Sequence, residues 1–126
     1  MVGIVIVSHS EKLAEGVVDV TRIMADGCPI AAAGGTEDGS YGTSYEKILR
    51  AVQSVHGDDG VLLLADMGSA VMTAELVIET CGYGDVVFAD CPIAEGAIAA
   101  SVASCCGDDL EAVKSQALST KAEAKW

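Results

Sequence analysis

The sequence is poor in basic residues. Lys and Arg together number 7 against 19 Asp and Glu, which gives a formal net charge of −12 at pH 7. Nucleic acids and anionic membranes carry the same sign of charge, so we expect neither as a partner. A protein partner with a basic face fits this charge, and so does a solvated acidic surface that only aids solubility.

Long apolar runs and a basic leader are also missing. No apolar run approaches the ~20 residues that a membrane-spanning helix needs. The apolar N-terminus lacks the basic residues of a secretory signal, so we expect a cytoplasmic protein. Hydrophobic residues make up 51% of the 126 residues. Because there is no repeat or low-complexity linker, we predict one domain over residues 1–126.

The cysteines form no recognisable metal or redox motif. The five are Cys28, Cys81, Cys91, Cys105 and Cys106. None belongs to a C-x-x-C pair and no histidine lies near them in the sequence, so no metal site is predicted. Free cysteines often behave as small core residues, and we interpret these as structural thiols in a reducing compartment.

Apolar runs and helical periodicity alternate along the chain. Continuous apolar runs predict buried parallel strands over residues 2–7, 29–33, 61–65 and 86–89. Helices are predicted after each strand, over about residues 9–26, 43–56, 69–81 and 93–105, and a closing helix begins near residue 110.

Two capping boxes and one apolar stripe refine the first two helices. Ser8-x-x-Glu11 and Thr43-x-x-Glu46 predict where these helices begin. The buried stripe predicted for the first helix consists of Leu13, Val17, Val20 and Met24.

The order of elements predicts the fold class. A βαβαβαβα pattern with a closing helix is typical of an α/β three-layer sandwich with a mostly parallel open sheet. Right-handed crossovers and helices on both faces require an interior first strand. Strand order 2-1-3-4 satisfies this, and ligands of such sheets bind beyond the strand ends where the order switches.

Three loops should meet at this switch, and they contain no Lys or Arg. The first holds Ser8, His9 and Ser10, the second spans residues 34–44, and the third spans residues 66–70. A neutral imidazole there can attack phosphorus, and a carboxylate such as Asp66 on its other nitrogen fixes the tautomer. The predicted phosphate-binding residues are Ser8, Ser10, Thr43, Ser44, Gly68 and Ser69.

Each residue also has a simple structural interpretation. His9 could be a helix-start residue, and Asp66 or Ser69 could cap the third helix. The glycine-rich second loop matches neither a P-loop nor G-x-G-x-x-G. His56, before Gly57, is interpreted as a capping or surface residue. The convergence of the three loops favours phosphorylation of His9, at Nε2 if the protein holds Nδ1.

Four segments resemble those of a known family. They are Val5-Ile6-Val7-Ser8-His9-Ser10, Gly42-Thr43, Asp66-Met67-Gly68-Ser69-Ala70 and Pro92-Ile93-Ala94-Glu95-Gly96. Their order and spacing resemble those of the phosphotransferase subunits of phosphoenolpyruvate-dependent dihydroxyacetone kinases, which have the mannose-type enzyme IIA fold. The first and third segments are the specific ones, and the resemblance covers almost the whole chain.

The resemblance implies a function. His9 would accept a phosphoryl group from the phosphocarrier HPr and pass it to ADP on the nucleotide-binding subunit of the kinase. We expect no cofactor and no metal. The resemblance also implies that the protein forms a homodimer. Some members continue into HPr-like and enzyme I-like domains. The sequence given ends at residue 126, so we expect a separate HPr.

Two alternatives stay open. A sugar-transport enzyme IIA of the mannose type would use the same histidine for a different client. A non-enzymatic binding module of flavodoxin-like or receiver-like type is the other. A flavodoxin needs a hydroxyl- and glycine-rich loop after its first strand, and a receiver needs paired acids there and a late lysine. The sequence has neither feature.

Overall fold

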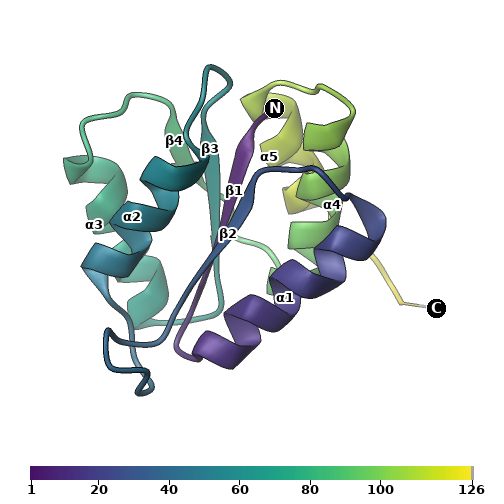
Figure 1. Cartoon of the computed structure of the whole chain (residues 1–126). Coiled ribbons are helices and arrows are strands. Elements are labelled where there is room, and N and C mark those ends of the chain that lie inside the picture. The colour runs from purple at the N-terminus through teal and green to yellow at the C-terminus, as the bar shows by residue number, and fades with distance from the viewer. Residues whose placement is uncertain (126) are drawn as a thin grey trace.

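The computed structural model describes residues 1–125 and contains a four-stranded, all-parallel sheet in the order β2-β1-β3-β4 (Figure 1). The strands are β1 (Gly3–Ser8), β2 (Ile30–Gly34), β3 (Val61–Ala65) and β4 (Val86–Phe88). The helices are α1 (Glu11–Met24), α2 (Tyr45–Val55), α3 (Ser69–Thr80), α4 (Ile93–Cys105) and α5 (Leu110–Ser119). The predicted α/β fold class and strand order are confirmed.

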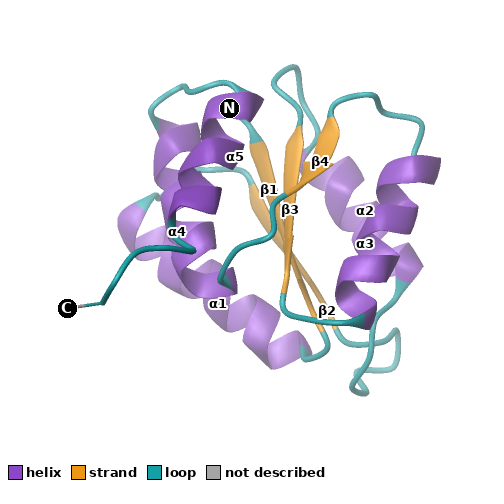
Figure 2. Ribbon diagram, turned by 180° about the vertical axis from the view of Figure 1, so that it is seen from behind, coloured by secondary structure: helices purple, strands orange, loops and turns teal. Residues whose placement is uncertain are grey.

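Helices cover both faces of the sheet. Figure 2 shows α1, α4 and α5 on one side and α2 and α3 on the other. Every residue of β1 and β3 is buried, because alternate side chains of each strand enter the two helical layers. Among residues 1–125, no helix combines the length and the apolar character that crossing a bilayer requires.

The register brings the carboxyl ends of the three longer strands together. Ser8 pairs with Gly34, and Val7 pairs with both Ala33 and Ala65. The segments that follow these strands therefore start side by side at one edge of the sheet. They are the same three segments that the sequence placed at the switch in strand order.

The predicted buried stripe of α1 is wrong except at one position. The buried residues are Ala14, Val17, Val18 and Thr21. Leu13, Val20 and Met24 are instead 45%, 46% and 63% exposed. The cause lies in β2, where Gly34 lets α1 approach the sheet closely. A Cβ on Gly34 would clash with the carbonyl oxygen of Ser10 and lie 2.8 Å from the Ala14 methyl.

Both predicted capping boxes are also wrong. Ser10 caps α1 by accepting a hydrogen bond from the Leu13 amide at 3.2 Å, and Ser44 caps α2 in the same way. Ser8 is still part of β1 and is fully buried. Because its hydroxyl contacts the neighbouring strand end instead, the first helix begins beyond it. The hydroxyl of Thr43 contacts Thr73 on α3 at 3.2 Å.

The close approach at Gly34 predicts opposite effects of two Gly→Ala substitutions. Gly34→Ala should lower the free energy of unfolding by about 1–3 kcal/mol, because the new methyl group overpacks the α1–β2 contact. Gly16→Ala, within α1, should raise it by about 0.5–1 kcal/mol, since a Cβ there meets nothing within 4 Å. Urea unfolding of both variants tests this. A Gly34→Ala protein as stable as the wild type would contradict the packing argument.

Candidate functional site

His9 follows β1 directly, and both of its ring nitrogens have partners from the segment after β3. Its Nδ1 lies 3.0 Å from Oδ1 of Asp66, and its Nε2 lies 2.7 Å from Oγ of Ser69. The side chain is 27% exposed, so the imidazole is held in place and is still reachable from solvent. His9 thus forms one contact group with two residues that lie 57 and 60 positions further along the sequence.

The carboxylate of Asp66 is the centre of this group. Its Oδ2 accepts hydrogen bonds from the Ser8 hydroxyl at 2.9 Å and from the His9 amide at 3.0 Å. Its Oδ1 accepts from the Met67 amide at 2.8 Å as well as facing the ring of His9. The Ser8 hydroxyl in turn accepts from the Ser10 amide at 3.0 Å. The segments after β1 and β3 are therefore tied together through one side chain.

These contacts set the charge of Asp66. Burial raises the pKa of its carboxyl group, but hydrogen bonds from the amide of His9, the hydroxyl of Ser8, the ring of His9 and the amide of Met67 outweigh burial. The result is a pKa below the usual value. An ionised carboxylate only accepts hydrogen bonds, so the Nδ1 that faces it carries the proton. In the neutral ring, Nε2 then keeps its lone pair and accepts from the Ser69 hydroxyl.

The N-terminus of α3, which has no side-chain cap, lies beside Nε2 of His9. The N-cap is Gly68, which has φ +48 and no side chain to cap the helix. That backbone conformation strongly favours glycine. Within residues 1–125, the N–H groups of Gly68 and Ser69 donate no hydrogen bond to other protein groups. Free N–H groups and the positive end of the helix dipole make this position suited to an anion.

The loop between β2 and α2 is fastened to the backbone of the histidine segment. The amide of Gly35 donates to the carbonyl oxygen of Ser8 at 3.1 Å, and the amide of Gly42 donates to that of His9 at 2.9 Å. Within the loop, hydrogen bonds from the Thr36 and Ser40 side chains and the Ser40 amide lower the pKa of Asp38 to about 2. Hydrogen bonds thus fix the loop both internally and against the backbone of the histidine segment.

Two cations of α2 hold this loop from outside, and sequence analysis missed them. Lys47 Nζ donates to the Gly34 carbonyl oxygen at 2.9 Å, and it pairs with Glu11 at 3.3 Å. Arg50 binds both carboxylate oxygens of Glu37, at 2.8 and 3.0 Å. The only sequence signal was their spacing along one face of the second helix.

The predicted site residues separate into two groups. Ser8, His9, Asp66 and Ser69 are in direct contact. Ser10 caps α1, and Thr43 and Ser44 line a surface hollow that also contains Glu37 and Asp38. Two carboxylates make that hollow a poor place for a phosphate. Asp66 does not cap α3, because its side chain is directed to His9 and Gly68 is the N-cap.

The second histidine lies apart from this group. His56, at the C-cap of α2, stacks on the ring of Tyr83 at a centroid distance of 3.9 Å. Its Nε2 lies 2.7 Å from Oδ1 of Asp85. This side chain is 22% exposed. His56 and Asp85 therefore form a histidine–aspartate pair like that of His9 and Asp66. This second pair links the segments that precede β3 and β4.

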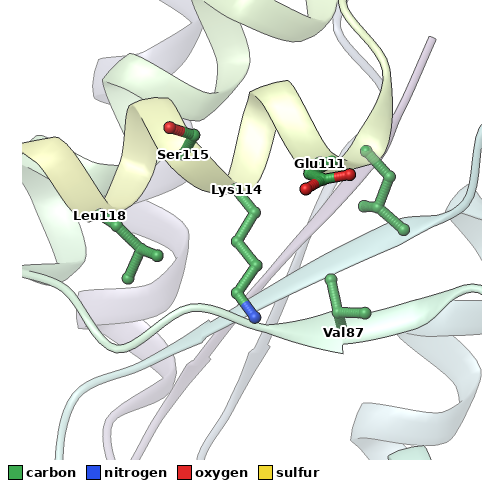
Figure 3. Close-up of a pocket in the computed structure, with 6 residues that line it drawn as sticks. Val87, Glu111, Lys114, Ser115 and Leu118 are labelled. Carbon is green, nitrogen blue, oxygen red and sulfur yellow. The ribbon is translucent and has the colours of Figure 1, made fainter.

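A groove on the α5 side contains none of the predicted site residues. It has a volume of about 570 Å³ and lies between β4 and α5, where Lys114 extends toward Val87 (Figure 3). It is lined by Val87, Leu110, Glu111, Lys114, Ser115 and Leu118. His9 lies outside this groove, and its side chain is partly exposed, so a group that another macromolecule presents can reach it.

Comparisons with known proteins show the family to which the chain belongs. A family model named EIIA-man, described as "PTS system fructose IIA component", matches residues 3–114. The chain is 40% identical over 120 residues to the "PEP-dependent dihydroxyacetone kinase, phosphoryl donor subunit DhaM" of Escherichia coli strain K12. That match covers 90% of this chain and 25% of the relative, so the chain spans about a quarter of the relative's length.

A relative of similar length and a solved structure extend the comparison. The "phosphotransferase subunit DhaM" of a PTS-dependent dihydroxyacetone kinase in Lactococcus lactis subsp. lactis strain IL1403 is 38% identical over 114 residues. The match covers 90% of this chain and 91% of that relative. The crystal structure of the "unknown function protein EF1359" superposes with a TM-score of 0.86 at 27% identity, covering 100% and 99% of the two chains. The resemblance inferred from the four segments is confirmed.

The hydrogen bonds of Asp66 predict a pH-dependent contribution to stability. Asp66→Asn should lower the free energy of unfolding by about 1–3 kcal/mol at pH 7, because charge-assisted hydrogen bonds are lost. The folded pKa of Asp66 is below its usual value, so this difference is present above about pH 4 and disappears as the pH falls through the folded pKa.

Urea unfolding at pH 7, 5 and 3 measures this difference. Asp19→Asn is the matched control, since Asp19 is exposed on α1 and the substitution removes the same charge. The control should show no such loss of stability. If the free energy of unfolding of Asp66→Asn stayed below that of the wild type by the same amount down to pH 3, the carboxylate charge would not be what stabilises the site.

Proposed function

Since the chain belongs to the EIIA-man family, we propose that it is a phosphohistidine carrier that accepts and donates a phosphoryl group at Nε2 of His9. The observation that carries this proposal is the fixed orientation of the imidazole ring. Asp66 holds Nδ1 at 3.0 Å, and Nε2 is directed toward Ser69 at the open end of α3. The relatives named as phosphoryl donor or phosphotransferase subunits support the same role.

The proposed acceptance step is an in-line displacement. The lone pair of Nε2 attacks the phosphorus of a donor phosphohistidine, the Nε2–P bond forms, and the P–N bond of the donor breaks. The ring of His9 becomes positively charged, and the carboxylate of Asp66 stabilises that charge through Nδ1–H. Donation reverses these changes when an acceptor oxygen attacks the phosphorus. Most of the catalysis is positioning and charge stabilisation.

Ser69 and the start of α3 are the proposed phosphoryl-binding groups. The Ser69 hydroxyl occupies the direction of attack from Nε2, so it turns aside and donates to a phosphoryl oxygen instead. The free N–H groups of Gly68 and Ser69 supply further donors. Ser8 and Ser10 act by positioning, because their side chains bind Asp66 and cap α1. The proposal does not rest on Thr43 or Ser44.

The proposed donor and client come from the family. We propose that the phosphoryl group comes from phospho-HPr and goes to ADP bound on the nucleotide-binding subunit of a dihydroxyacetone kinase, in the cytoplasm. With that client the chain is a subunit of a phosphotransferase. A homodimer is part of the proposal. The acidic surface, with a net charge of −12, favours partners with basic faces for both steps.

The assignment of His9 predicts which histidine carries the phosphoryl group. With phosphoenolpyruvate, enzyme I and HPr present, the wild type should gain one acid-labile phosphoryl group in intact-mass measurements. His9→Ala should gain none. His56→Ala is the matched control, because it removes the only other histidine, and it should be phosphorylated like the wild type.

The same phosphorylated protein identifies the client. Transfer to the nucleotide-binding subunit of a dihydroxyacetone kinase loaded with ADP should produce ATP. Transfer to a mannose-type IIB domain instead would make this chain a sugar-transport component. Phosphorylation of His9→Ala, or no adduct on the wild type while HPr itself is phosphorylated, would refute the carrier proposal.

The role of Asp66 predicts a kinetic defect without loss of the acceptor. Asp66→Asn should slow transfer from phospho-HPr by about 100-fold or more, because the ring loses its fixed tautomer and charge partner. Rapid-quench measurement gives the rate, and ¹⁵N NMR of the imidazole should show a shift away from the Nδ1–H tautomer. Asp85→Asn is the control, since Asp85 pairs with His56 at 2.7 Å. If Asp66→Asn accepted the phosphoryl group as fast as the wild type, Asp66 would have only a structural role.

A further inference from the structure

Two threonine hydroxyls connect the loop before α2 with the first turn of α3. The hydroxyl of Thr73 donates to the carbonyl oxygen of Ser69 at 2.7 Å, and the hydroxyl oxygens of Thr43 and Thr73 lie 3.2 Å apart. Each hydroxyl has one proton to donate, and a carbonyl oxygen only accepts. Because the proton of Thr73 is donated to Ser69, Thr43 is the donor to Thr73. We refer to Thr43 and Thr73 as the threonine pair.

The threonine pair belongs to a closed circuit of hydrogen bonds that includes the reactive histidine. The amide of Gly42, the residue before Thr43, donates to the carbonyl oxygen of His9 at 2.9 Å. The hydroxyl of Ser69 lies 2.7 Å from Nε2 of the same histidine. His9 and Ser69 are therefore connected twice, once directly and once through the second loop and the threonine pair.

The first turn of α3 needs such support because it has no side-chain cap. Its N-cap is Gly68, whose backbone has φ +48. Ser69 is exposed, so burial does not fix the place of its hydroxyl in front of Nε2. Reacting groups keep their geometry when hydrogen bonds from supporting residues hold them. The hydrogen bond from Thr73 to the Ser69 carbonyl oxygen supplies this constraint at the residue that contacts His9.

A second hydroxyl pair of the same kind lies at the other end of α3. The hydroxyl of Thr80 donates to the carbonyl oxygen of Leu76 at 2.8 Å and lies 2.6 Å from the hydroxyl of Tyr45 on α2. The two helices lie side by side on one face of the sheet (Figure 2). Both pairs thus fasten α3 to its neighbours. Of the two, the threonine pair is the one that reaches a residue in contact with His9.

We propose that Thr43 and Thr73 are positioning residues for phosphoryl transfer. They act through Ser69, whose hydroxyl they keep in place at Nε2 of His9. When the phosphoryl group arrives, that hydroxyl turns to donate to it, while the backbone of Ser69 stays fixed because Thr73 still binds its carbonyl oxygen. The donor is therefore in position before the transition state forms. This inference rests on the carrier function proposed above, and it gives the Gly42-Thr43 segment a role that the transfer step itself does not.

¹⁵N NMR of the resting protein tests this positioning without any phosphoryl transfer. Thr73→Val removes the hydroxyl and keeps the branched shape, so it should move the Nε2 resonance of His9 in the same direction as Ser69→Ala does. Thr73→Ser keeps the hydroxyl and should leave the resonance at the wild-type position. Thr80→Val is the matched control, because it removes the corresponding hydroxyl far from His9, and it should leave the resonance unchanged. An Nε2 resonance that Thr73→Val does not move would overturn the proposal.

Rapid-quench measurement of transfer from phospho-HPr gives the effect on the reaction. Thr73→Val and Thr43→Val should each slow transfer by about 5- to 20-fold, because the Ser69 hydroxyl is no longer held in position. Thr73→Ser and Thr80→Val should transfer at the wild-type rate. Every variant should still gain one phosphoryl group at the end point, because His9 is intact. Circular dichroism confirms that each variant is folded.

A double-mutant cycle separates positioning of Ser69 from a general effect on the fold. If Thr73 acts through the Ser69 hydroxyl, Thr73→Val should slow transfer by less than about twofold when Ser69→Ala is already present. Equal slowing in both backgrounds, or the same slowing by Thr80→Val, would overturn the proposal. A wild type that accepts no phosphoryl group would refute the carrier function instead, and the NMR comparison would still show whether Thr73 positions Ser69.

Discussion

The hydrogen bond between Oδ1 of Asp66 and Nδ1 of His9 is the contact on which the site depends. The same carboxylate binds the Ser8 hydroxyl and two backbone amides, so it joins the ends of β1 and β3 while it orients the imidazole. Because these donors keep Asp66 ionised, the proton is placed on Nδ1 and the lone pair on Nε2. One side chain therefore sets the geometry, the tautomer and the charge balance together.

The surroundings of His9 suit a carrier better than a tight phosphate-binding protein. No Lys or Arg side chain bonds to His9, Asp66 or Ser69 within residues 1–125. Lys47 and Arg50 of α2 instead bind Gly34 and Glu37, at the end of β2 and in the connection that follows it. Backbone N–H groups and a helix dipole stabilise an anion without neutralising it fully. In the proposed carrier, this keeps the phosphoryl group transferable to the next acceptor.

Packing around the site is close because small residues meet there. Gly34 ends β2 against the first turn of α1, and a methyl group at that position would strike Ser10 and Ala14. The adjoining loop is tied through Gly35 and Gly42 to the carbonyl oxygens of Ser8 and His9. The imidazole thus rests in a rigid frame, in which a small displacement of α1 would move the reactive segment as well.

Much of the fold could be predicted because it follows from local patterns and chain topology. Buried parallel strands are continuous apolar runs, and right-handed crossovers then lead to the order 2-1-3-4. The same rules bring the segments after β1 and β3 together, so the pairing of His9 with Asp66 was accessible from the sequence alone. The four resembling segments added the family and its chemistry.

Only the tertiary structure decided the features that depend on distant neighbours. The buried face of α1 depends on Gly34 in β2, against which the small Ala14 packs where the larger Leu13 would not fit. The choice of Ser10 over Ser8 as a cap follows from the pairing of Ser8 with Gly34. Periodicity within one segment contains no information about how closely another segment approaches. For the same physical reason, the sequence determined the elements and their order, and three-dimensional packing decided which side chains meet.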